Sequence, residues 1–266
     1  MALDGVDLSV ERGELLAVIG HTGSGKSTLI QHFNGILRPS SGRVLLNGKD
    51  IWADKKEIRS VRFQVGLCFQ YPEYQLFEET VYKDIAFGPR NMGLNTEEID
   101  VRVREAARYV GLTQAHLDAS PFDLSGGEKR RAAIAGVIAM RPEILILDEP
   151  TAGLDPAGRE AILALIQEYR KQTGATVLIV SHSMEDVARI ATRVLVIDRA
   201  RIAMCGTVHE VFSHTEELLG IGLNVPQVTR VFHELSRRGY SVPDDVYTVE
   251  QGRDVLLDLL RKEGKI

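Results

Sequence analysis

The chain has 266 residues, 44% of them hydrophobic, so it is long enough to bury a full core. Its 32 basic and 37 acidic side chains give a net charge near −5. This charge argues against nucleic acid as a partner, because binding a phosphate backbone usually needs a basic face. Two cysteines, Cys68 and Cys205, are too few for a disulfide framework or a metal cluster, which favours a reducing cytoplasm. All apolar runs are far shorter than the roughly 20 residues that span a bilayer.

Short apolar runs alternate with helical patterns, which predicts a mainly parallel sheet covered by helices. The predicted strands, in chain order, are residues 15–19, 65–69, 144–147, 176–180 and 194–198. Residues 43–51 predict a hairpin that turns at Asn47 and Gly48, so we expect an antiparallel part as well.

The loop after the first predicted strand matches the pattern G-x4-G-K-[ST] and precedes a predicted helix. Its glycines let the backbone turn inward so that amides point at phosphate oxygens, and the helix N-terminus adds its dipole. We predict that Lys26 reaches the β- and γ-phosphates and that the Ser27 hydroxyl binds Mg²⁺. A glycine-rich turn is the alternative, which the flanking strand and helix disfavour. The nucleotide-binding residues of this phosphate loop are Gly20, His21, Thr22, Gly23, Ser24, Gly25, Lys26, Ser27 and Thr28.

A second segment with affinity for anions is predicted at residues 124–128, Leu-Ser-Gly-Gly-Glu, just before an apolar helix. Ser125 and Glu128 fit a capping box, and the two glycines between them make a tight entry to the helix. The same geometry places amides and a hydroxyl at a helix N-terminus, which favours an anion. On the residues alone both interpretations stay open. If the second holds, a nucleotide could be shared between two molecules.

Two adjacent carboxylates, Asp148 and Glu149, follow the buried strand 144–147. Successive strand residues point to opposite sides, so the two acids cannot have the same task. We predict that one orients Mg²⁺ and its water while the other faces the attacking water as a base or polariser. The alternative is a strand that runs into an acidic turn, and the phosphate loop makes this alternative weak.

The remaining helices are predicted from their ends. Asp155 is an N-cap followed by Pro156, and the helix that they open stops near Gly174. Residues 97–110 form another helix that stops at Gly111, and Ser183 begins a short one. Beyond about residue 206, helices are predicted from Pro226 to Gly239 and, after a capping box of Thr248 and Gln251, to the end. We therefore expect a nucleotide-binding domain over 1–206, with a helical part at about 80–140, and a helical extension over 207–266.

Taken in chain order, the motifs resemble those of the ABC-type ATPases. The order is the phosphate loop, Gln70 at the end of the strand 65–69, the segment 124–128, the two acids, Asp155 and then His182. The resemblance implies an α/β fold: a RecA-like parallel sheet core with an antiparallel β part and a helical signature subdomain. In that family two subunits pair head to tail, and each ATP lies between one subunit's phosphate loop and the other's signature segment.

The resemblance also implies a role for each matching position. Ser125, Gly126 and Gly127 would bind the ATP held by the partner subunit. Asp148 would orient Mg²⁺, and Glu149 would be the catalytic base. Three further roles come from the resemblance alone: Gln70 would contact Mg²⁺ or the attacking water and sense a membrane partner, Asp155 would couple across the dimer, and His182 would hold the γ-phosphate.

Three stretches, residues 20–23, 69–81 and 126–131, narrow the resemblance to the ATPase of energy-coupling factor transporters. These are importers of vitamins and of cobalt or nickel ions, and the pattern is closest to the second of their two related ATPase subunits. The resemblance runs from about residue 2 to the end, because residues 225–228 are similar to that group's dimerisation extension. It implies an ATP-hydrolysing motor subunit that is peripheral to the cytoplasmic face of the cell membrane.

The implied partners are a second ATPase subunit, identical or related, and a membrane-embedded coupling subunit, with a substrate-binding membrane subunit engaged indirectly. The coupling subunit would be contacted near Gln70 to Glu79. Glu73, Glu78 and Glu79 are candidate partners for its basic residues, and a solvated acidic face is the alternative.

One departure from the family concerns adenine. Family members carry an N-terminal strand with an aromatic residue that stacks on the base, and here no aromatic residue occurs before Phe33. Either the natural start lies upstream, or adenine is bound without that stack, which is worth roughly 1–3 kcal/mol in single-stranded nucleic-acid sites.

Two other functions are weighed against the importer motor. The ATPase of an importer fed by a separate solute-binding protein is disfavoured by the helical extension and by residues 71–79. A soluble mechanochemical ATPase of DNA repair or translation is disfavoured because no heptads lie between the phosphate loop and the signature segment. The transported substrate and the choice between homodimer and heterodimer are outside the reach of the sequence.

Overall fold

The computed structural model describes residues 2–262, and these form two compact units. Residues 8–14 and 26–180 make the larger unit. Of the remaining described residues, 2–7, 15–25 and 181–262 make the smaller unit. Among the described residues, no helix combines the length and the apolarity of a membrane span.

The larger unit is built on three parallel strands, with β5 (Ile144–Asp148) between β4 (Val65–Cys68) and β6 (Thr176–Val180). The side chains at 145–147 are completely buried, as continuous apolar runs in parallel strands usually are. The register pairs Asp148 with Val180, so Asp148 lies at the carboxyl edge of these strands. The three predicted strands are confirmed, with β4 one residue shorter than expected.

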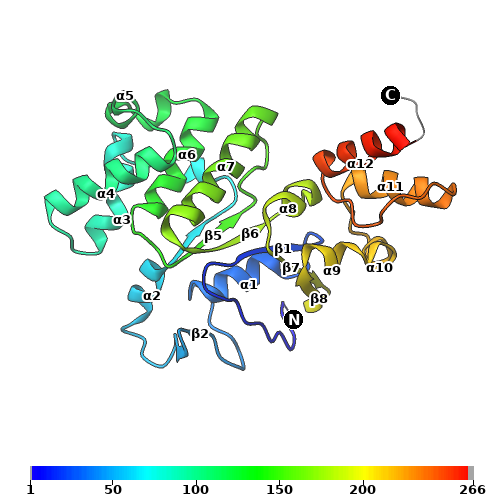
Figure 1. Ribbon diagram of the computed structural model, residues 1–266. Coiled ribbons are helices and arrows are strands. Elements are labelled where there is room, and N and C mark those ends of the chain that lie inside the picture. The colour runs from blue at the N-terminus through cyan, green and yellow to red at the C-terminus, as the bar shows by residue number, and fades with distance from the viewer. Residues whose placement is uncertain (1, 263–266) are drawn as a thin grey trace. The chain divides into compact units, whose positions relative to one another are not determined.

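Helices surround these strands in the larger unit, and Figure 1 shows α3, α4 and α6 packed together, with α6 and α7 beside the strands. The helices of this unit are α1 (Lys26–Phe33), α2 (Ile58–Gln64), α3 (Val81–Asn91), α4 (Thr96–Tyr109), α5 (Gln114–Asp118), α6 (Gly126–Ile138) and α7 (Pro156–Thr173), with short 3-10 turns η1 (Pro72–Gln75) and η2 (Pro121–Asp123). The predicted hairpin is also confirmed: β2 (Leu45–Leu46) pairs antiparallel with β3 (Lys49–Asp50) around Asn47 and Gly48, which both have positive φ.

The predicted helix caps are confirmed as well. The Asp155 carboxylate accepts a hydrogen bond of 2.6 Å from the backbone N–H of Gly158, and Pro156 opens α7. The helix ends at Gly174 in a left-handed conformation (φ 67°), which a residue without Cβ adopts readily. Asp155 and Pro156 thus mark the start of α7, and Gly174 marks its end.

The smaller unit pairs β1 (Leu15–Gly20) in parallel with β7 (Arg193–Asp198), and β8 (Arg201–Thr207) runs antiparallel to β7. Sequence reasoning missed β8. Its hairpin turns at Arg199 and Ala200, which take left-handed φ values of 45° and 67° without glycine or asparagine to announce the turn. None of the described residues before β1 is in a strand, and the Asp4 N–H donates to the carbonyl of Ala200 at 2.8 Å.

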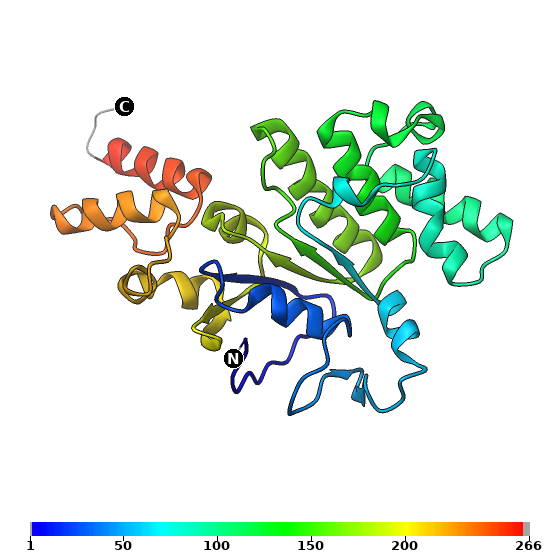
Figure 2. The ribbon, with the colours of Figure 1, turned by 180° about the vertical axis from the view of Figure 1, so that it is seen from behind.

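Five helices complete the described part of the smaller unit: α8 (Met184–Ile190), α9 (Val208–Phe212), α10 (Thr215–Gly220), α11 (Gln227–Arg237) and α12 (Val249–Lys262). Figure 2 shows α11 and α12 lying side by side. Phe232 of α11 is 1% exposed, and a Cβ on Gly252 of α12 would come within 3.2 Å of its ring. Glycine therefore permits the close approach of these two helices.

Candidate nucleotide site

The carboxyl end of β5 and the start of α1 meet in the larger unit. The Ser27 hydroxyl donates to Oδ2 of Asp148 at 3.5 Å. Lys26 is 6% exposed, and Asp148 and Glu149 are each 8% exposed. Four predicted site residues thus lie together at the carboxyl end of the parallel strands, where α/β folds bind their ligands: Lys26, Ser27, Asp148 and the predicted base Glu149.

Burial shifts the pKa values of two charged groups in this cluster. Burial lowers the pKa of Lys26, and the charges of Glu149 and Asp148 oppose that shift. Burial also raises the pKa of Asp148, although the hydrogen bond from Ser27 and the charge of Lys26 act the other way. In both cases desolvation is the largest effect, so burial disfavours the charged forms of Lys26 and Asp148.

Glu149 adopts a left-handed backbone conformation with φ 51°. Such a conformation costs a residue that carries a Cβ about 1–2 kcal/mol. It is held in part by the N–H of Glu149, which donates to the carbonyl of Val180 at 3.0 Å. Strain of this kind is concentrated at functional sites, and here it falls on the residue predicted as the base.

The first part of the phosphate loop belongs to the smaller unit and needs its glycines. Gly20, Gly23 and Gly25 have φ values of 153°, 80° and 113°. A Cβ on Gly20 would collide with the carbonyl of Ile197, and one on Gly25 would lie 2.6 Å from the carbonyl of Ala2. Side chains are therefore excluded at both positions. Thr22 is exposed, and the chain continues into α1 at Lys26, followed by the half-buried Thr28.

The second residue of the phosphate loop contacts the segment after α10. His21 Nε2 donates to the carbonyl of Ile221, within the smaller unit. Next to it, Gly222 has φ 73°, and a Cβ there would lie 2.9 Å from His21 Nε2. Ser24 is buried, and its carbonyl accepts from the N–H of Ala200 at 3.0 Å. The loop is thus supported by two distant parts of the chain.

The signature segment caps α6 and lies at the surface of the larger unit. The Ser125 hydroxyl donates to Oε2 of Glu128 at 2.7 Å, and the Glu128 N–H donates back to it at 3.4 Å. The predicted capping box is therefore confirmed. Ser125 and Gly126 are exposed and Gly127 is half-buried, with no atom near the position of a Cβ on either glycine. This open surface is compatible with a contact from another molecule.

Gln70 follows β4 at an exposed position, and an aromatic surface comes directly after it. Tyr71 is 41% exposed, Tyr74 85% and Phe77 60%. Phe77 packs edge-on against Phe87 of α3 with their centroids 5.1 Å apart. Large aromatic side chains gathered on a surface mark an interaction site, and we call these four residues the aromatic surface.

Three glutamates of this stretch have the same predicted role, but they differ in exposure and in their partners: Glu73, Glu78 and Glu79. Glu79 is exposed and ion-pairs with Lys83. Glu73 is instead turned inward and forms a bidentate ion pair with Arg130, its side chain only 15% exposed. Glu73 is therefore already paired within the chain, and contact of these glutamates with a membrane subunit stays a prediction.

Asp155 and His182 are the remaining predicted site residues, and each lies just before a helix. Asp155 is exposed and caps α7, as described above. His182 belongs to the smaller unit and is exposed just before α8, whose N-cap is Ser183. Sequence reasoning also missed a residue, because Arg130 stands in a basic run yet is 2% exposed. Its one signal was helical spacing: it lies four residues before the buried Ile134.

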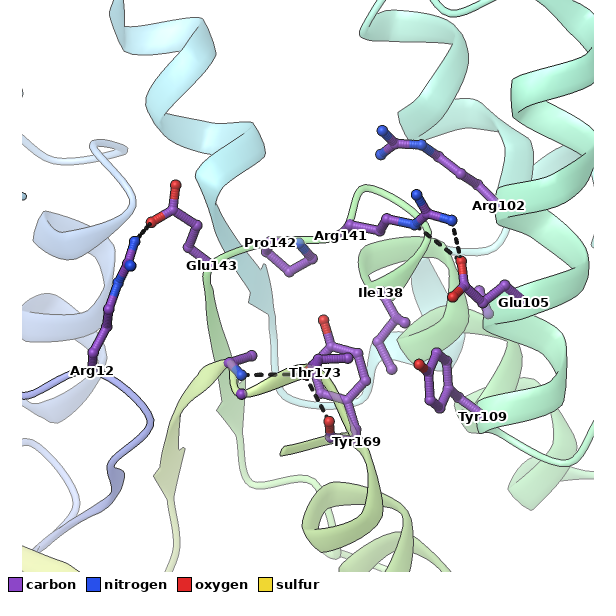
Figure 3. Close-up of a pocket in the computed structure, with 13 residues that line it drawn as sticks. Arg12, Arg102, Glu105, Tyr109, Ile138, Arg141, Pro142, Glu143, Tyr169 and Thr173 are labelled. Carbon is purple, nitrogen blue, oxygen red and sulfur yellow. Dashed lines mark hydrogen bonds and ion pairs between the residues drawn. The ribbon is translucent and has the colours of Figure 1, made fainter. Parts of the chain in front are cut away.

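A cavity of about 410 Å³ opens at the amino end of β5, within the larger unit, and Figure 3 shows its walls. Arg12 pairs with Glu143 at 2.9 Å, and Arg141 Nε donates to Glu105 at 3.0 Å. None of the predicted site residues lines this cavity. This cavity is therefore not the nucleotide site that the motifs predict.

Comparison with known proteins leads to the same family as the motifs. Residues 3–152 match the ABC transporter family. The chain is 53% identical over 265 residues to the energy-coupling factor transporter ATP-binding protein EcfA2 of Clostridium perfringens, covering 99% of this chain and 93% of that protein. It is 54% identical over 261 residues to the EcfA2 of Caldanaerobacter subterraneus, covering 98% and 91%.

Solved structures agree in fold. The cbiO1 of Clostridium perfringens, described as part of the ABC transporter complex cbiONQ, is 42% identical with a TM-score of 0.76, covering 88% of this chain and 92% of its own. The ATP-binding cassette MJ0796, solved as a dimer bound to ADP and Pi, is 26% identical with a TM-score of 0.70, covering 78% and 90%. These likenesses confirm the expected α/β fold.

Proposed function

The chain belongs to the ABC transporter family, and we propose that it is the ATP-hydrolysing motor subunit of an energy-coupling factor importer. The observation that carries the proposal is the meeting of Lys26 and Ser27 with two buried acids at the carboxyl end of β5. Two relatives are named for that transporter class, and their similarity to this chain extends over nearly its whole length.

Phosphate binding is the task that we propose for the loop 20–28. Gly23 has no atom within 4 Å of the position of a Cβ, so its backbone is open to a ligand, and the N-terminus of α1 favours an anion. Lys26, at the start of α1, would donate to the phosphates of a bound triphosphate. His182 would add a contact to the γ-phosphate, in keeping with the family resemblance.

The residues present fit Mg²⁺. The Ser27 hydroxyl and the Asp148 carboxylate converge to 3.5 Å and are oxygen donors, which this ion prefers, with its other positions left to water and phosphates. We propose these two side chains, with Gln70, as the residues that would hold it. When bound, Mg²⁺ would neutralise charge that develops on the phosphates.

Hydrolysis is the task that we propose for Glu149. It follows β5 directly, is 8% exposed and lies in a strained turn that fixes its direction. A buried carboxylate beside Lys26 can accept a proton from an attacking water, and its burial keeps bulk water away. Gln70 would help to orient that water.

A second ATPase subunit completes the site in this proposal. The exposed amides and hydroxyl at the start of α6 would reach the ATP of a partner, and Asp155 would lie at the same interface. The capping bond from Ser125 to Glu128 shows that the hydroxyl can serve a negative oxygen. We also propose that residues 207–266 extend this dimer contact; the exposed Val231 and Val249 on α11 and α12 support this.

The aromatic surface is the part that we propose for the membrane-embedded coupling subunit. Tyr74 and Phe77 offer apolar area, and Glu78 and Glu79 beside them favour a basic partner. The chain would then lie at the cytoplasmic face of the cell membrane, and the substrate-binding subunit would be engaged indirectly. We propose a vitamin or a cobalt or nickel ion as the cargo, on the family resemblance alone.

Glu149→Gln tests the proposal directly. We expect ATP to bind with unchanged affinity while hydrolysis falls roughly 100-fold to 10,000-fold, the range for a lost general base. Phosphate release measures the second quantity, and retention of labelled ATP on the protein measures the first. Near-normal phosphate release would contradict the assignment of Glu149.

Capture of the chain through a tag, from detergent-solubilised membranes of its source, tests the partners. We expect a membrane protein and a second ATPase chain to be retained together. Recovery of the chain free of any membrane protein would contradict the importer assignment and leave the hydrolysis assignment standing.

A further inference from the structure

Arg130 of α6 joins two functional turns of the larger unit through one buried guanidinium. Its Nε and Nη2 donate to Oε2 and Oε1 of Glu73 at 3.0 and 2.6 Å, a fork that suits a carboxylate. Its Nη1 donates to the carbonyl of Pro150 at 3.3 Å and to the carbonyl of Ala152. The first contact holds η1 beside the aromatic surface, and the others hold the turn that begins at Glu149.

Both turns are strained where they meet Arg130. Tyr71, two residues before Glu73, has φ 54°, and Glu149, one residue before Pro150, has φ 51°. Left-handed backbone at residues with a Cβ persists only where the surroundings hold it. The Tyr71 ring also lies 5.8 Å from the guanidinium, and a Cβ on Gly153 would lie 3.8 Å from that ring. Arg130 thus contacts both turns, through the Tyr71 ring and Glu73 on one side and through the carbonyls of Pro150 and Ala152 on the other.

The ion pair is secluded from water. The side chains of Arg130 and Glu73 are 3% and 15% exposed. Burial alone raises the pKa of Glu73, but the hydrogen bonds and charge of Arg130 outweigh it and leave that pKa below its usual value. The pair therefore stays ionised. Buried ion pairs often stabilise a fold no better than apolar side chains of the same size, so stability alone does not account for this arrangement.

We propose that Arg130 is a positioning residue, which transmits displacement of η1 by a membrane partner to the direction of Glu149. A partner that pushes on the aromatic surface would move Glu73, and the same guanidinium would carry the movement to the carbonyls beside the base. This inference rests on the proposed function, because it takes Glu149 as the base and the aromatic surface as the docking site.

The test removes the whole pair with Arg130→Met and Glu73→Leu in one protein. No buried charge is left without a partner, so we expect this variant to fold. We expect the KM for ATP within about twofold of the parent and kcat lowered at least about tenfold, since small misplacement of a catalytic group is costly. If the ion pair served only to stabilise the fold, its removal would not lower kcat while leaving KM unchanged.

The matched control replaces an exposed ion pair of the same unit. Arg104 Nε donates to Asp100 at 2.8 Å on α4, with side chains 51% and 41% exposed. Arg104→Met with Asp100→Leu removes equivalent charges away from both turns. We expect KM and kcat to match the parent.

Hydrolysis is measured both for the isolated full chain and for the complex captured from membranes. A kcat within twofold of the parent in the Arg130 and Glu73 double variant would overturn the proposal. If that variant does not fold, Glu73→Gln replaces it, because glutamine keeps the size of the side chain and one hydrogen-bond acceptor. We expect Glu73→Gln to lower kcat and to leave KM unchanged. An unchanged kcat in this variant would also overturn the proposal. If the parent binds ATP but does not hydrolyse it in either preparation, the proposed function fails and the positioning role falls with it.

Discussion

The two ends of strand β5 carry charged residues in opposite arrangements. At the amino end, Arg12 pairs with Glu143 and Arg141 pairs with Glu105 around the cavity of Figure 3. At the carboxyl end, two acids share Lys26, and burial works against the charged form of both Lys26 and Asp148. Charges at the first end form ion pairs at the surface, whereas those at the second are buried together.

The comparison teaches that the two ends differ in what they offer to a ligand. The cavity at the amino end has about 410 Å³ but is walled by satisfied ion pairs and by Tyr109 and Tyr169. The carboxyl end has the strained turn, the desolvated groups and a helix N-terminus. Parallel α/β folds place ligands at this end, since helices begin there.

Among these predictions, Lys26→Ala should have the largest effect on the function of the carboxyl end of β5. We expect ATP affinity to fall roughly 100-fold, or about 3 kcal/mol, because a buried charged donor to the phosphates is lost. The fold should survive, since the lost ammonium is desolvated and its burial is unfavourable. Titration with a fluorescent ATP analogue measures the affinity, and circular dichroism checks the fold. Unchanged affinity would remove Lys26 from the site.

Asp148→Asn should separate function from stability. We expect hydrolysis to fall at least about tenfold, because a neutral amide holds a divalent ion less well than a carboxylate. In the nucleotide-free chain we expect unfolding to become harder by about 1 kcal/mol, since a desolvated charge is removed and the hydrogen bond from Ser27 can persist. Urea denaturation without nucleotide measures this. A loss of stability would mean that Asp148 is already compensated.

Tyr169 sharpens the comparison at the amino end. Burial raises the pKa of Tyr169 to about 12, so the unfolded chain ionises first as the pH rises. Stability is therefore full below pH of about 10, the usual value, and falls above it by at most about 1.4 kcal/mol per pH unit. We expect Tyr169→Phe to lose less stability than the parent between pH 9 and pH 11 in urea denaturation. Identical losses would show that Tyr169 ionises freely in the folded chain.

Arg141→Gln should have the smallest effect. The pair with Glu105 is half-exposed, and such pairs contribute about 0–1 kcal/mol. We expect a loss of stability within that range and no change in KM or kcat, in contrast to any change at the carboxyl end. A change of KM for ATP would mean that the amino end of β5 communicates with the nucleotide.

Much of the fold was predictable because its signals are local. Apolar runs marked five strands, and caps such as Asp155 and Gly174 marked helix ends within a residue or two. The cluster of Lys26, Ser27 and Asp148 was also foreseeable, because the sequence predicts that both motifs follow strands of a parallel sheet, whose carboxyl ends collect ligands.

What sequence reasoning missed depends on contacts between distant segments. Arg130 cannot be told from Lys129 or Arg131 by composition, and only the tertiary partners Glu73 and Pro150 account for its burial. Strand β8 was missed because its turn at Arg199 and Ala200 uses residues that seldom adopt left-handed backbone.

The contact of His21 with Ile221 bears on how this protein can be shortened. The sequence changes character near residue 206, and a protein cut there would retain every nucleotide motif. It would nevertheless lack the carbonyl that accepts from the imidazole of the phosphate loop, and the bare Gly222 that makes room for it. A minimal nucleotide-binding fragment should therefore extend beyond residue 222, so the end of the motifs is not the end of the structure that serves them.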